Sequence, residues 1–332
     1  MTTGTANFPT LNEILSGFNM AELRTLAKAL RIRGRSQMKK EALAKSVSEG
    51  ILESWILESM LIIQDNRTFA LFLRSLQSGQ SVKMDIPNSS FEQDLFFKLF
   101  FPPLNDDRYY VPDDVREAAL PLIENGLPEK RKRYWLLHRY ALAAVNLYGL
   151  IPADELIDIF NSQSAKKTND EEVIDALSRF EASHMGYCFW EGYITDEGFI
   201  YNKFDDAKDL IRLCDDKPRY VPKAKEFLKY SDWEYYEKSS HTMKLFQFLQ
   251  KELNAPVEDV ADMVMEMYHA CVIEADLEFY PRFLAEFDII MTEDQLSRLY
   301  AIIMELHNNA RLWSNKGYTL SELAVLNREQ YD

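Results

Sequence analysis

The sequence predicts a mainly α-helical protein with several domains, and three observations support this fold class. Apolar residues recur at the three-to-four-residue spacing of amphipathic helices through most of the chain. Glycine and proline together account for only 23 of 332 residues while hydrophobic residues make up 47%, so most of the chain should be ordered. A chain of this length exceeds what one core usually needs, which indicates two or three domains.

The first predicted domain is a small helical module at residues 1–50. Asn19 and Glu22 occupy the two positions of a helix capping box, and the apolar residues that follow them recur at helical spacing. Gly34 interrupts this pattern, and a second helix resumes after Met38 with Val47 on its inward face. We expect two or three short helices around a small core.

Residues 51–104 are predicted to be connecting core helices. The stretches "ILESWILESMLII" and "FEQDLFFKLFF" are strongly apolar and have helical spacing. The two prolines and the acidic loop of "FFPPLNDD" then mark a boundary, and "PDDV" begins a new helix with carboxylates at its positive end. We therefore place the next domain at residues 105–204.

This middle domain is predicted to be winged-helix-like. One helix ends at Gly149, a second begins at Pro152, and "NDEEVIDALSRFEA" forms a third with an acidic first turn. The aromatic stretch "GYCFWEGYITDEGFIYN" then has the composition of a β-hairpin, with a turn expected at "TDEG". Three helices followed by a hairpin is the element order of winged-helix domains.

The third of these helices argues against DNA recognition by the middle domain. In DNA-binding members of that fold, the third helix enters the major groove. Here it has Arg179 as its one basic residue among several acidic ones, and carboxylates repel phosphates. The four carboxylates that we expect it to present are those of Glu171, Glu172, Asp175 and Glu181. The sequence favours a structural or protein-binding role for this domain.

Residues 205–332 are predicted to form a C-terminal helical domain. The segment between Thr292 and Asn309 shows the clearest single apolar stripe, which should face a core. The stripe consists of Leu296, Leu299, Ile302, Ile303 and Leu306.

Charge is distributed unevenly along the chain, and this gives the main functional indication. Residues 1–50 hold eight Lys and Arg and four Glu, which gives this segment a net charge of +4. Because the whole chain has a net charge of −15, residues 51–332 carry a net charge of −19. Five of these basic residues cluster around the predicted inter-helix turn: Arg31, Arg33, Arg35, Lys39 and Lys40. Such a cluster can hold phosphates without reading sequence. The alternative is a solvated helix face, or a face that binds the acidic remainder.

A second basic run, Lys130, Arg131, Lys132 and Arg133, precedes Tyr134 and Trp135. We treat it as a secondary basic patch for phosphate contact. The alternative is a solvated helix start beside an acidic loop.

The N-terminal segment resembles a known module. The order "MAELRTLAKALRIRGRSQMKKEALAKSV" is similar to the N-terminal helical domain of the Rho transcription termination factor and, more loosely, to the SAP helix–extension–helix module. The resemblance covers about 40 of 332 residues. It implies nucleic-acid contact through the five residues around the turn, and a bacterial or phage source. The oligonucleotide-binding barrel that follows the domain in the termination factor and a GxxxxGK[ST] phosphate loop are both absent from the sequence, so no ATPase is implied.

No catalytic or metal-binding pattern is present in the sequence. Cys188, Cys214 and Cys271 form no CxxC pair, Glu266 and His269 form a single ExxH, and neither HExxH nor GxSxG occurs. We therefore expect a protein that is not an enzyme, with no cofactor and no metal. The cysteine usage, together with the lack of a leader-like start or a long apolar run, indicates the cytoplasm and no membrane partner.

Two functional hypotheses follow. The first is a nucleic-acid-associated regulatory protein that contacts DNA or RNA through the N-terminal module while its acidic remainder engages another protein. The second is an acidic protein–protein adaptor without nucleic-acid binding. The first requires the five basic side chains to be exposed together, whereas the second allows them to be paired with carboxylates of the remainder.

Overall fold

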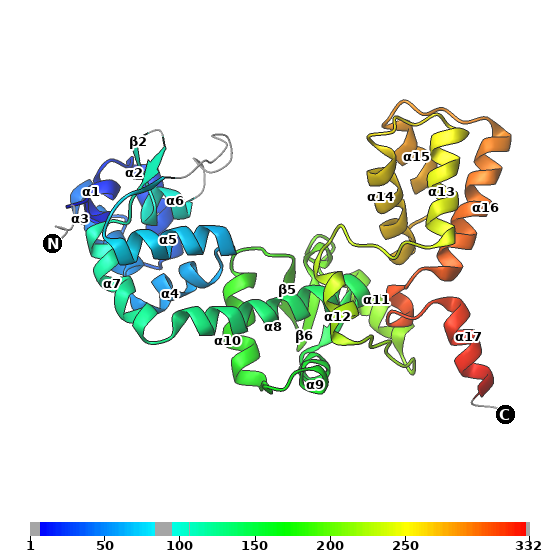
Figure 1. Ribbon diagram of the computed structural model, residues 1–332, viewed down its shortest axis with the longest axis horizontal. Helices are drawn as coiled ribbons and strands as arrows, with labels where there is room; N and C mark the ends of the chain where they lie inside the picture. Colours follow the sequence, from blue (N-terminus) through cyan, green and yellow to red (C-terminus); the bar gives the residue numbers. More distant parts are fainter. Residues whose placement is uncertain (1–6, 84–94, 106, 330–332) are drawn as a thin grey trace. The chain divides into compact units, whose positions relative to one another are not determined.

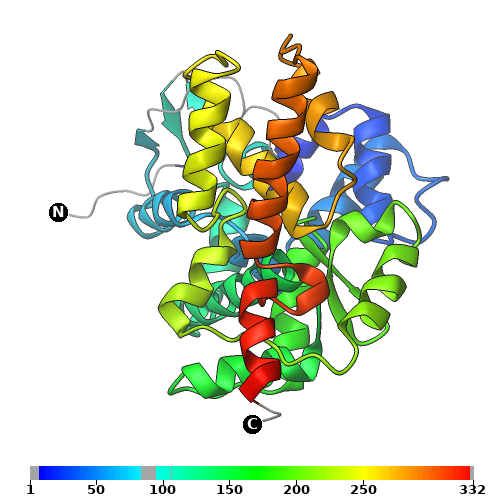
Figure 2. The same ribbon diagram turned by 90° about the vertical axis from the view of Figure 1, so that its right-hand side faces the viewer.

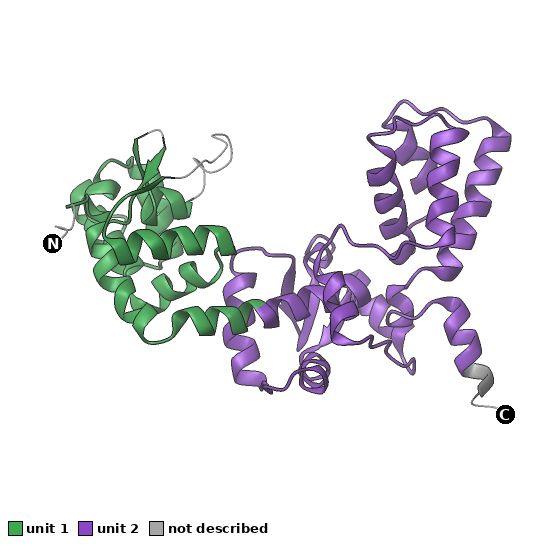
Figure 3. Ribbon diagram, viewed as in Figure 1, with its two compact units in different colours: residues 1–135 green, residues 136–332 purple. Residues whose placement is uncertain are grey.

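The computed structural model describes residues 7–83, 95–105 and 107–329. The chain forms two compact units, unit 1 at residues 1–135 and unit 2 at residues 136–332 (Figure 3). The described residues form seventeen α-helices and two small three-stranded sheets, which confirms the predicted mainly α-helical, multi-domain fold (Figure 1). Residues 84–94, within the predicted connecting segment, lie outside the described residues.

Unit 1 is a set of short helices with one small sheet. Its helices are α1 (Leu11–Ser16), α2 (Met20–Ala29), α3 (Lys40–Ile51), α4 (Ser54–Ile62), α5 (Asn66–Ser78), α6 (Leu95–Phe100) and α7 (Asp113–Glu124). Its strands are β1 (Val82–Lys83), β2 (Pro103–Asn105) and β3 (Arg108–Tyr109), in the antiparallel order β1-β3-β2. The sequence did not predict this sheet, because strands of two or three residues show no period-2 pattern.

The N-terminal helices pack on the rest of unit 1 through the start of α7. The Asp114 carboxylate accepts a hydrogen bond from the Leu11 amide at 2.8 Å, and Asp113 accepts one from the Phe8 amide at 3.2 Å. The Phe8 and Tyr110 rings stack with centroids 4.9 Å apart. The acidic helix start at Asp113 and Asp114 therefore binds the amides at the start of α1 from within the same unit, and the compact units divide between residues 135 and 136.

The first half of unit 2 combines helices with a three-stranded sheet. Its elements are α8 (Leu127–Tyr148, shared with unit 1), β4 (Leu150–Pro152), α9 (Ala153–Gln163), α10 (Asp170–Glu181), β5 (Tyr187–Trp190) and β6 (Tyr193–Asp196). The strands are antiparallel in the order β4-β6-β5, with Ile194 opposite both Ile151 and Phe189. The predicted hairpin is present as β5 and β6.

The hairpin turns at Glu191 and Gly192 and not at the "TDEG" stretch. Both residues have positive φ, +48° and +86°, as a two-residue turn of type I′ requires. "TDEG" instead ends β6 and begins a short 3₁₀ helix, η2 (Glu197–Ile200), in which the Asp196 carboxylate accepts from the Gly198 amide. The sequence also did not predict β4, which is only three residues long.

Gly149 joins α8 to β4 at a point of close packing. Its φ is +74°, and a Cβ at this position would lie 2.5 Å from the Trp313 ring and 2.9 Å from the Leu210 side chain. Its carbonyl accepts a hydrogen bond from the Asp196 amide at 2.8 Å. Glycine is therefore required both by the backbone conformation and by the space available.

The C-terminal half of unit 2 contains a helical bundle. The remaining elements are α11 (Asp205–Cys214), α12 (Ala224–Phe227), η3 (Leu228–Ser231), α13 (Ser240–Lys251), α14 (Val260–Val272), α15 (Phe279–Ala285), α16 (Glu293–Asn309), η4 (Trp313–Asn315) and α17 (Leu320–Glu329). Helix α13 lies beside α14 and α16 (Figures 1 and 2). Of the predicted apolar stripe on α16, Leu299, Ile303 and Leu306 are buried in the bundle core, and Leu296 and Ile302 are partly buried.

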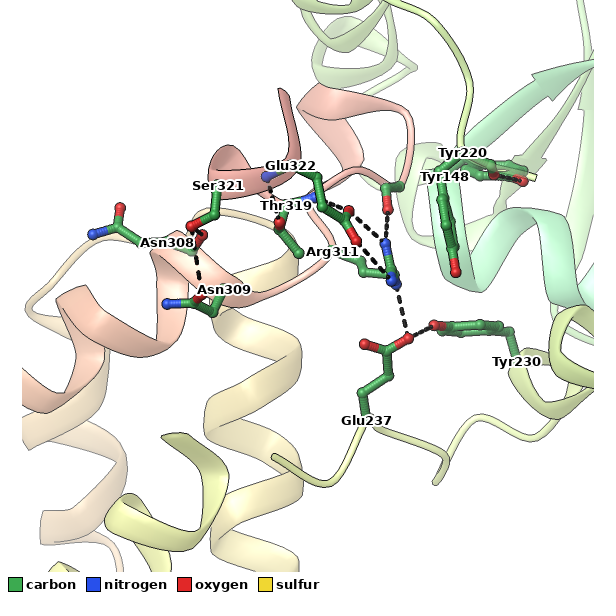
Figure 4. Close-up of polar contacts among 11 residues, drawn as sticks. Tyr148, Tyr220, Tyr230, Glu237, Asn308, Asn309, Arg311, Thr319, Ser321 and Glu322 are labelled. Atoms are coloured by element: carbon green, nitrogen blue, oxygen red, sulfur yellow. Dashed lines mark hydrogen bonds and ion pairs between the residues drawn. The ribbon is translucent and has the colours of Figure 1, made fainter. Parts of the chain in front are cut away.

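A buried arginine joins the segments that surround the bundle. Arg311, which follows α16, is 8% exposed. Its Nε donates to Glu237 at 2.8 Å, and its Nη1 donates to Glu322 at 2.9 Å and to the Gly317 carbonyl at 3.0 Å (Figure 4). The guanidinium also lies 3.6 Å from the centroid of the Tyr220 ring. Glu237 accepts a further bond from the Tyr230 hydroxyl at 2.5 Å, so this network is satisfied by charge-assisted bonds.

His138 is a buried imidazole in the core of unit 2. Its ring stacks on Phe180 with centroids 4.1 Å apart, and its Nδ1 lies 3.0 Å from the Tyr187 hydroxyl. Burial lowers the pKa of His138 to about 4, because the charged form is poorly solvated there.

We expect Arg311→Met to lower the free energy of unfolding of the intact protein by about 2–4 kcal/mol, because two carboxylates lose their partner. Urea denaturation measures this change. Arg298→Met is the control, since Arg298 pairs with Glu252 at 2.6 Å but its side chain is 54% exposed; a loss below about 1 kcal/mol is expected there. Equal losses in the two variants would contradict the role assigned to Arg311.

We expect acid to destabilise unit 2 through His138. The imidazole pKa is near its usual 6.5 in the unfolded chain and about 4 in the folded protein, so the unfolded chain binds the proton more strongly between these values. The free energy of unfolding should therefore fall by about 3 kcal/mol as the pH drops from 6.5 to 4. Urea denaturation across this range should show a shallower pH dependence for His138→Asn than for the exposed control His184→Asn.

Candidate nucleic-acid interface

The first three helices of unit 1 form a module, residues 7–51, with its own small core. Capping boxes fix the starts of α1 and α2: Thr10 with Glu13, and Asn19 with Glu22. The inward side chains that hold the module together are fully buried: Leu11, Leu15, Leu23, Ala27, Leu43, Ala44 and Val47. The predicted helical spacing is confirmed here, and the capping box at Asn19 is present.

The first residues of the segment between α2 and α3 lie close to the C-terminal end of α3. A Cβ built at Gly50 of α3 would lie 3.4 Å from the Leu30 side chain and 4.0 Å from that of Ile32, which is ordinary van der Waals contact. Arg31 and Gly34 both have positive φ, +53° and +71°. The Ile32 amide donates to the Ala27 carbonyl at 2.9 Å, so the chain turns back over the end of α2.

The five basic residues predicted as a site all lie in this segment or at the start of α3. Arg31, Arg33, Lys39 and Lys40 are exposed, and Arg35 is half-buried. Arg35 donates to the Ile32 carbonyl at 3.2 Å. Within the part of the chain that the structure describes, none of the five makes an ion pair. We name these five residues the basic segment.

The N-terminus of α3 adds backbone donors to the basic segment. Whereas the caps of α1 and α2 satisfy their first amides, the N-cap Lys39 makes no side-chain capping bond. The amides of the first turn of α3 therefore lack a side-chain cap at the positive end of the helix dipole, where Lys39 and Lys40 begin the helix. This combination suits an anion such as a phosphate.

Sequence reasoning missed two further basic residues of the module. Arg24 and Lys28 are exposed on α2, four residues apart and so on one face of that helix. Their i, i+4 spacing in the sequence could have identified them as one basic face. They were missed because only the basic residues clustered around the turn were considered.

The secondary basic patch is not one exposed surface. The Lys130 ammonium contacts both carboxylate oxygens of Glu58, at 2.9 and 3.0 Å. Arg131 is 4% exposed, donates to Asn66 at 2.8 Å and to the Gln64 carbonyl, and lies over the Phe69 ring. Lys132 is exposed and 3.7 Å from Glu129, and Arg133 is half-buried with contacts of its own. Lys130 and Arg131 therefore serve the packing of unit 1.

Helix α10 of unit 2 presents an acidic face. Arg179, its one basic residue, pairs with Asp175 at 2.9 Å. Glu172 accepts from the Thr168 hydroxyl, and Glu181 accepts from the Phe189 amide. These carboxylates stabilise the helix and its neighbours and leave no basic side chain on α10 for phosphate contact.

The other residues considered for chemistry form no metal centre among those that the structure describes. No group of three or more His, Cys, Asp or Glu could hold a metal ion there. Glu266 and His269 lie on α14, where burial lowers the pKa of His269. All three cysteines are buried, and burial raises the pKa of each thiol. Over the described residues, no helix has the length and apolar character that a membrane span needs.

Comparisons of the chain with protein-family models, with curated proteins and with solved structures give no match.

We expect Arg131→Gln to lower the free energy of unfolding by about 2–4 kcal/mol, because buried charge-assisted bonds and ring contacts are lost. Arg33→Gln, at an exposed residue with no ion pair among the described residues, should leave the unfolding curve unchanged. Urea denaturation of the two variants checks this contrast. If Arg131→Gln is as stable as the unchanged protein, the buried role assigned to Arg131 is wrong.

Proposed function

We propose that this protein is a non-enzymatic, nucleic-acid-associated regulatory protein that contacts DNA or RNA phosphates through its N-terminal module. The observation that carries the proposal is the exposure of the basic segment without ion pairs among the described residues. A cluster that served only to dock the module on carboxylates of the chain would be paired. Here it is the carboxylates of α7 that anchor the module, and they bind backbone amides of residues 8 and 11.

The contact is electrostatic and independent of base sequence. Lys and Arg side chains and the first amides of α3 are donors to phosphate oxygens, which position a protein on nucleic acid without reading bases. The net charge of −19 over residues 51–332 repels phosphates, so the contact is confined to the module. Binding should therefore be weak and should fall steeply with salt.

The arrangement of elements supports the proposal at the level of fold. The module has the order helix, turn with glycine, helix, which is the order that the resemblance to the Rho N-terminal domain and the SAP module implies. In unit 2, the order α8-β4-α9-α10-β5-β6 with sheet order β4-β6-β5 is the topology that we assign as winged-helix-like. Since α10 is acidic, we assign this part of unit 2 to protein contact.

The alternative function is an acidic protein–protein adaptor that does not bind nucleic acid. One observation favours it: Ile174, on the outward face of α10 beside Glu171, is 57% exposed. An apolar side chain among carboxylates fits a protein partner better than it fits nucleic acid.

The test is a salt titration of binding to random single-stranded and duplex oligonucleotides, followed by fluorescence anisotropy. The intact protein should bind with a roughly micromolar dissociation constant at low salt. A variant with all five residues of the basic segment changed to Gln should lose this binding. On duplex DNA, each lost phosphate contact should reduce the slope of log K against log salt by about 0.9.

A charge-matched control distinguishes the loss of the basic segment from the effect of a lower net charge on binding. It changes five exposed lysines of unit 2 to Gln, which gives the same change in charge away from the module: Lys203, Lys223, Lys225, Lys238 and Lys251. This control should retain most of the binding. Equal losses in both variants would refute the assignment to the basic segment, and no binding by the unchanged protein at low salt would favour the adaptor.

A further inference from the structure

Unit 2 contains a small cavity beside the sheet of β4, β5 and β6. The cavity has a volume of ≈ 140 Å³. Its walls come from the end of α8, from β4 and β6, from α11 and from the segments around residues 219 and 316. Its lining includes Tyr148, Leu150, Tyr193, Ile211, Arg219 and Lys316. We name this cavity the Arg219 pocket.

Arg219 is buried in the wall of the pocket, and one of its terminal nitrogens lacks a partner among the described residues. Its side chain is 10% exposed, and its Nε donates to Glu155 at 2.7 Å. The guanidinium lies 4.5 Å from the centroid of the Tyr148 ring, which fixes its plane. Its Nη1 is buried and has no hydrogen-bond partner among the described residues. A guanidinium has five N–H donors, and a buried donor without an acceptor is costly.

Two further donors line the same pocket. The Lys316 ammonium and the Tyr193 hydroxyl have no hydrogen bond or ion pair with any residue that the structure describes. Lys316 is held in a left-handed backbone conformation, with φ +48°, at the end of η4, and Tyr193 begins β6. Three separate segments of the chain therefore contribute donor-bearing residues to the lining of one small cavity.

The charge around the pocket is positive in a unit that is otherwise acidic. Lys217 bonds to two neutral acceptors, the Ser314 carbonyl at 2.8 Å and the Asn315 side-chain oxygen at 2.9 Å, so its charge is not neutralised there. Lys217, Arg219 and Lys316 all act electrostatically on the Cys214 thiol, which lines the pocket. Among the residues that line the pocket, the two cations Arg219 and Lys316 are balanced by the two carboxylates Glu155 and Asp215. Lys217 does not line the pocket but adds one positive charge beside it.

We propose that the Arg219 pocket is a binding site for a small organic carboxylate. The Arg219 fork, the Lys316 ammonium and the Tyr193 hydroxyl are the donors for the carboxylate oxygens. Leu150, Ile211 and the tyrosine rings provide an apolar wall for a short aliphatic body. A single negative charge matches the one positive charge that Lys217 adds beside the balanced lining, whereas a phosphate dianion exceeds it.

The test is isothermal titration calorimetry of the intact protein with butyrate, acetate, butyramide and inorganic phosphate. Butyrate should bind with a dissociation constant of roughly 1 mM. Acetate should bind more weakly, because it lacks the apolar body. Butyramide has a similar shape without the charge and should show no binding, and phosphate should bind more weakly than butyrate.

Two variants locate the binding. Arg219→Gln removes the guanidinium and should weaken butyrate binding about 10- to 100-fold. Lys316→Asn removes the ammonium, and asparagine tolerates the left-handed backbone conformation of this position. This variant should weaken butyrate binding about tenfold. The matched control is Lys203→Asn, because Lys203 is exposed, has φ +57° and is not among the residues that line the pocket. It should leave the dissociation constant unchanged.

Three results would overturn the proposal. The first is equal binding of butyrate and butyramide, which would exclude recognition of the charge. The second is a dissociation constant for Lys316→Asn equal to that of the Lys203→Asn control. The third is tighter binding of phosphate than of butyrate, which would exclude the carboxylate class. Since Lys316 is partly exposed, its substitution keeps the test decisive even where Arg219→Gln fails to fold.

Discussion

The Arg311 guanidinium is the contact on which the arrangement of unit 2 depends most. It binds residues 237, 317 and 322 and stacks on residue 220, which belong to different segments of the chain. Much of the segment between α11 and α13 lacks regular secondary structure, so side-chain bonds rather than a backbone ladder position it. Burying this charge is unfavourable by itself. The two carboxylates, the carbonyl and the tyrosine ring together compensate for its lost hydration.

The arginines of this protein differ in burial and in the number of N–H donors that have a hydrogen-bond partner, and these differences distinguish structural arginines from those available to a ligand. Arg311 and Arg131 are buried and hydrogen-bonded to several partners, which is the condition under which a buried cation stabilises a fold. Arg33 is exposed and unpaired among the described residues, so it is available to an external anion. Arg219 is intermediate, since it is buried, paired through one nitrogen and unpaired at another. That intermediate state is what a small binding site requires.

The local features of the fold could be predicted from the sequence, and the contacts between distant segments could not. Helical spacing and capping residues predicted the module, the acidic α10 and the apolar stripe of α16, because these patterns lie within a single helix. Strand β4 was missed because three residues carry no periodicity. The run at residues 130–133 looked like a surface patch, and only the packing of α4 and α5 near it shows that Arg131 is interior. The basic segment was predicted because its residues are adjacent in sequence. Arg219 and Arg311 were not, since each is a lone arginine that pairs with a carboxylate more than sixty residues away, Glu155 and Glu237 respectively, although Arg311 also binds the nearer Glu322.

The contact between Gly149 and the Trp313 ring has a consequence for how this sequence can change over evolution. A side chain at residue 149 would occupy the space of the indole, and the positive φ there disfavours any other residue. A smaller residue at 313 would free that space but would lose the indole bond to the Asn146 carbonyl. The two positions are therefore expected to covary among related chains, with glycine at 149 kept wherever tryptophan is kept at 313. A sequence in which both differ would identify a relative whose sheet meets its C-terminal segment in another way.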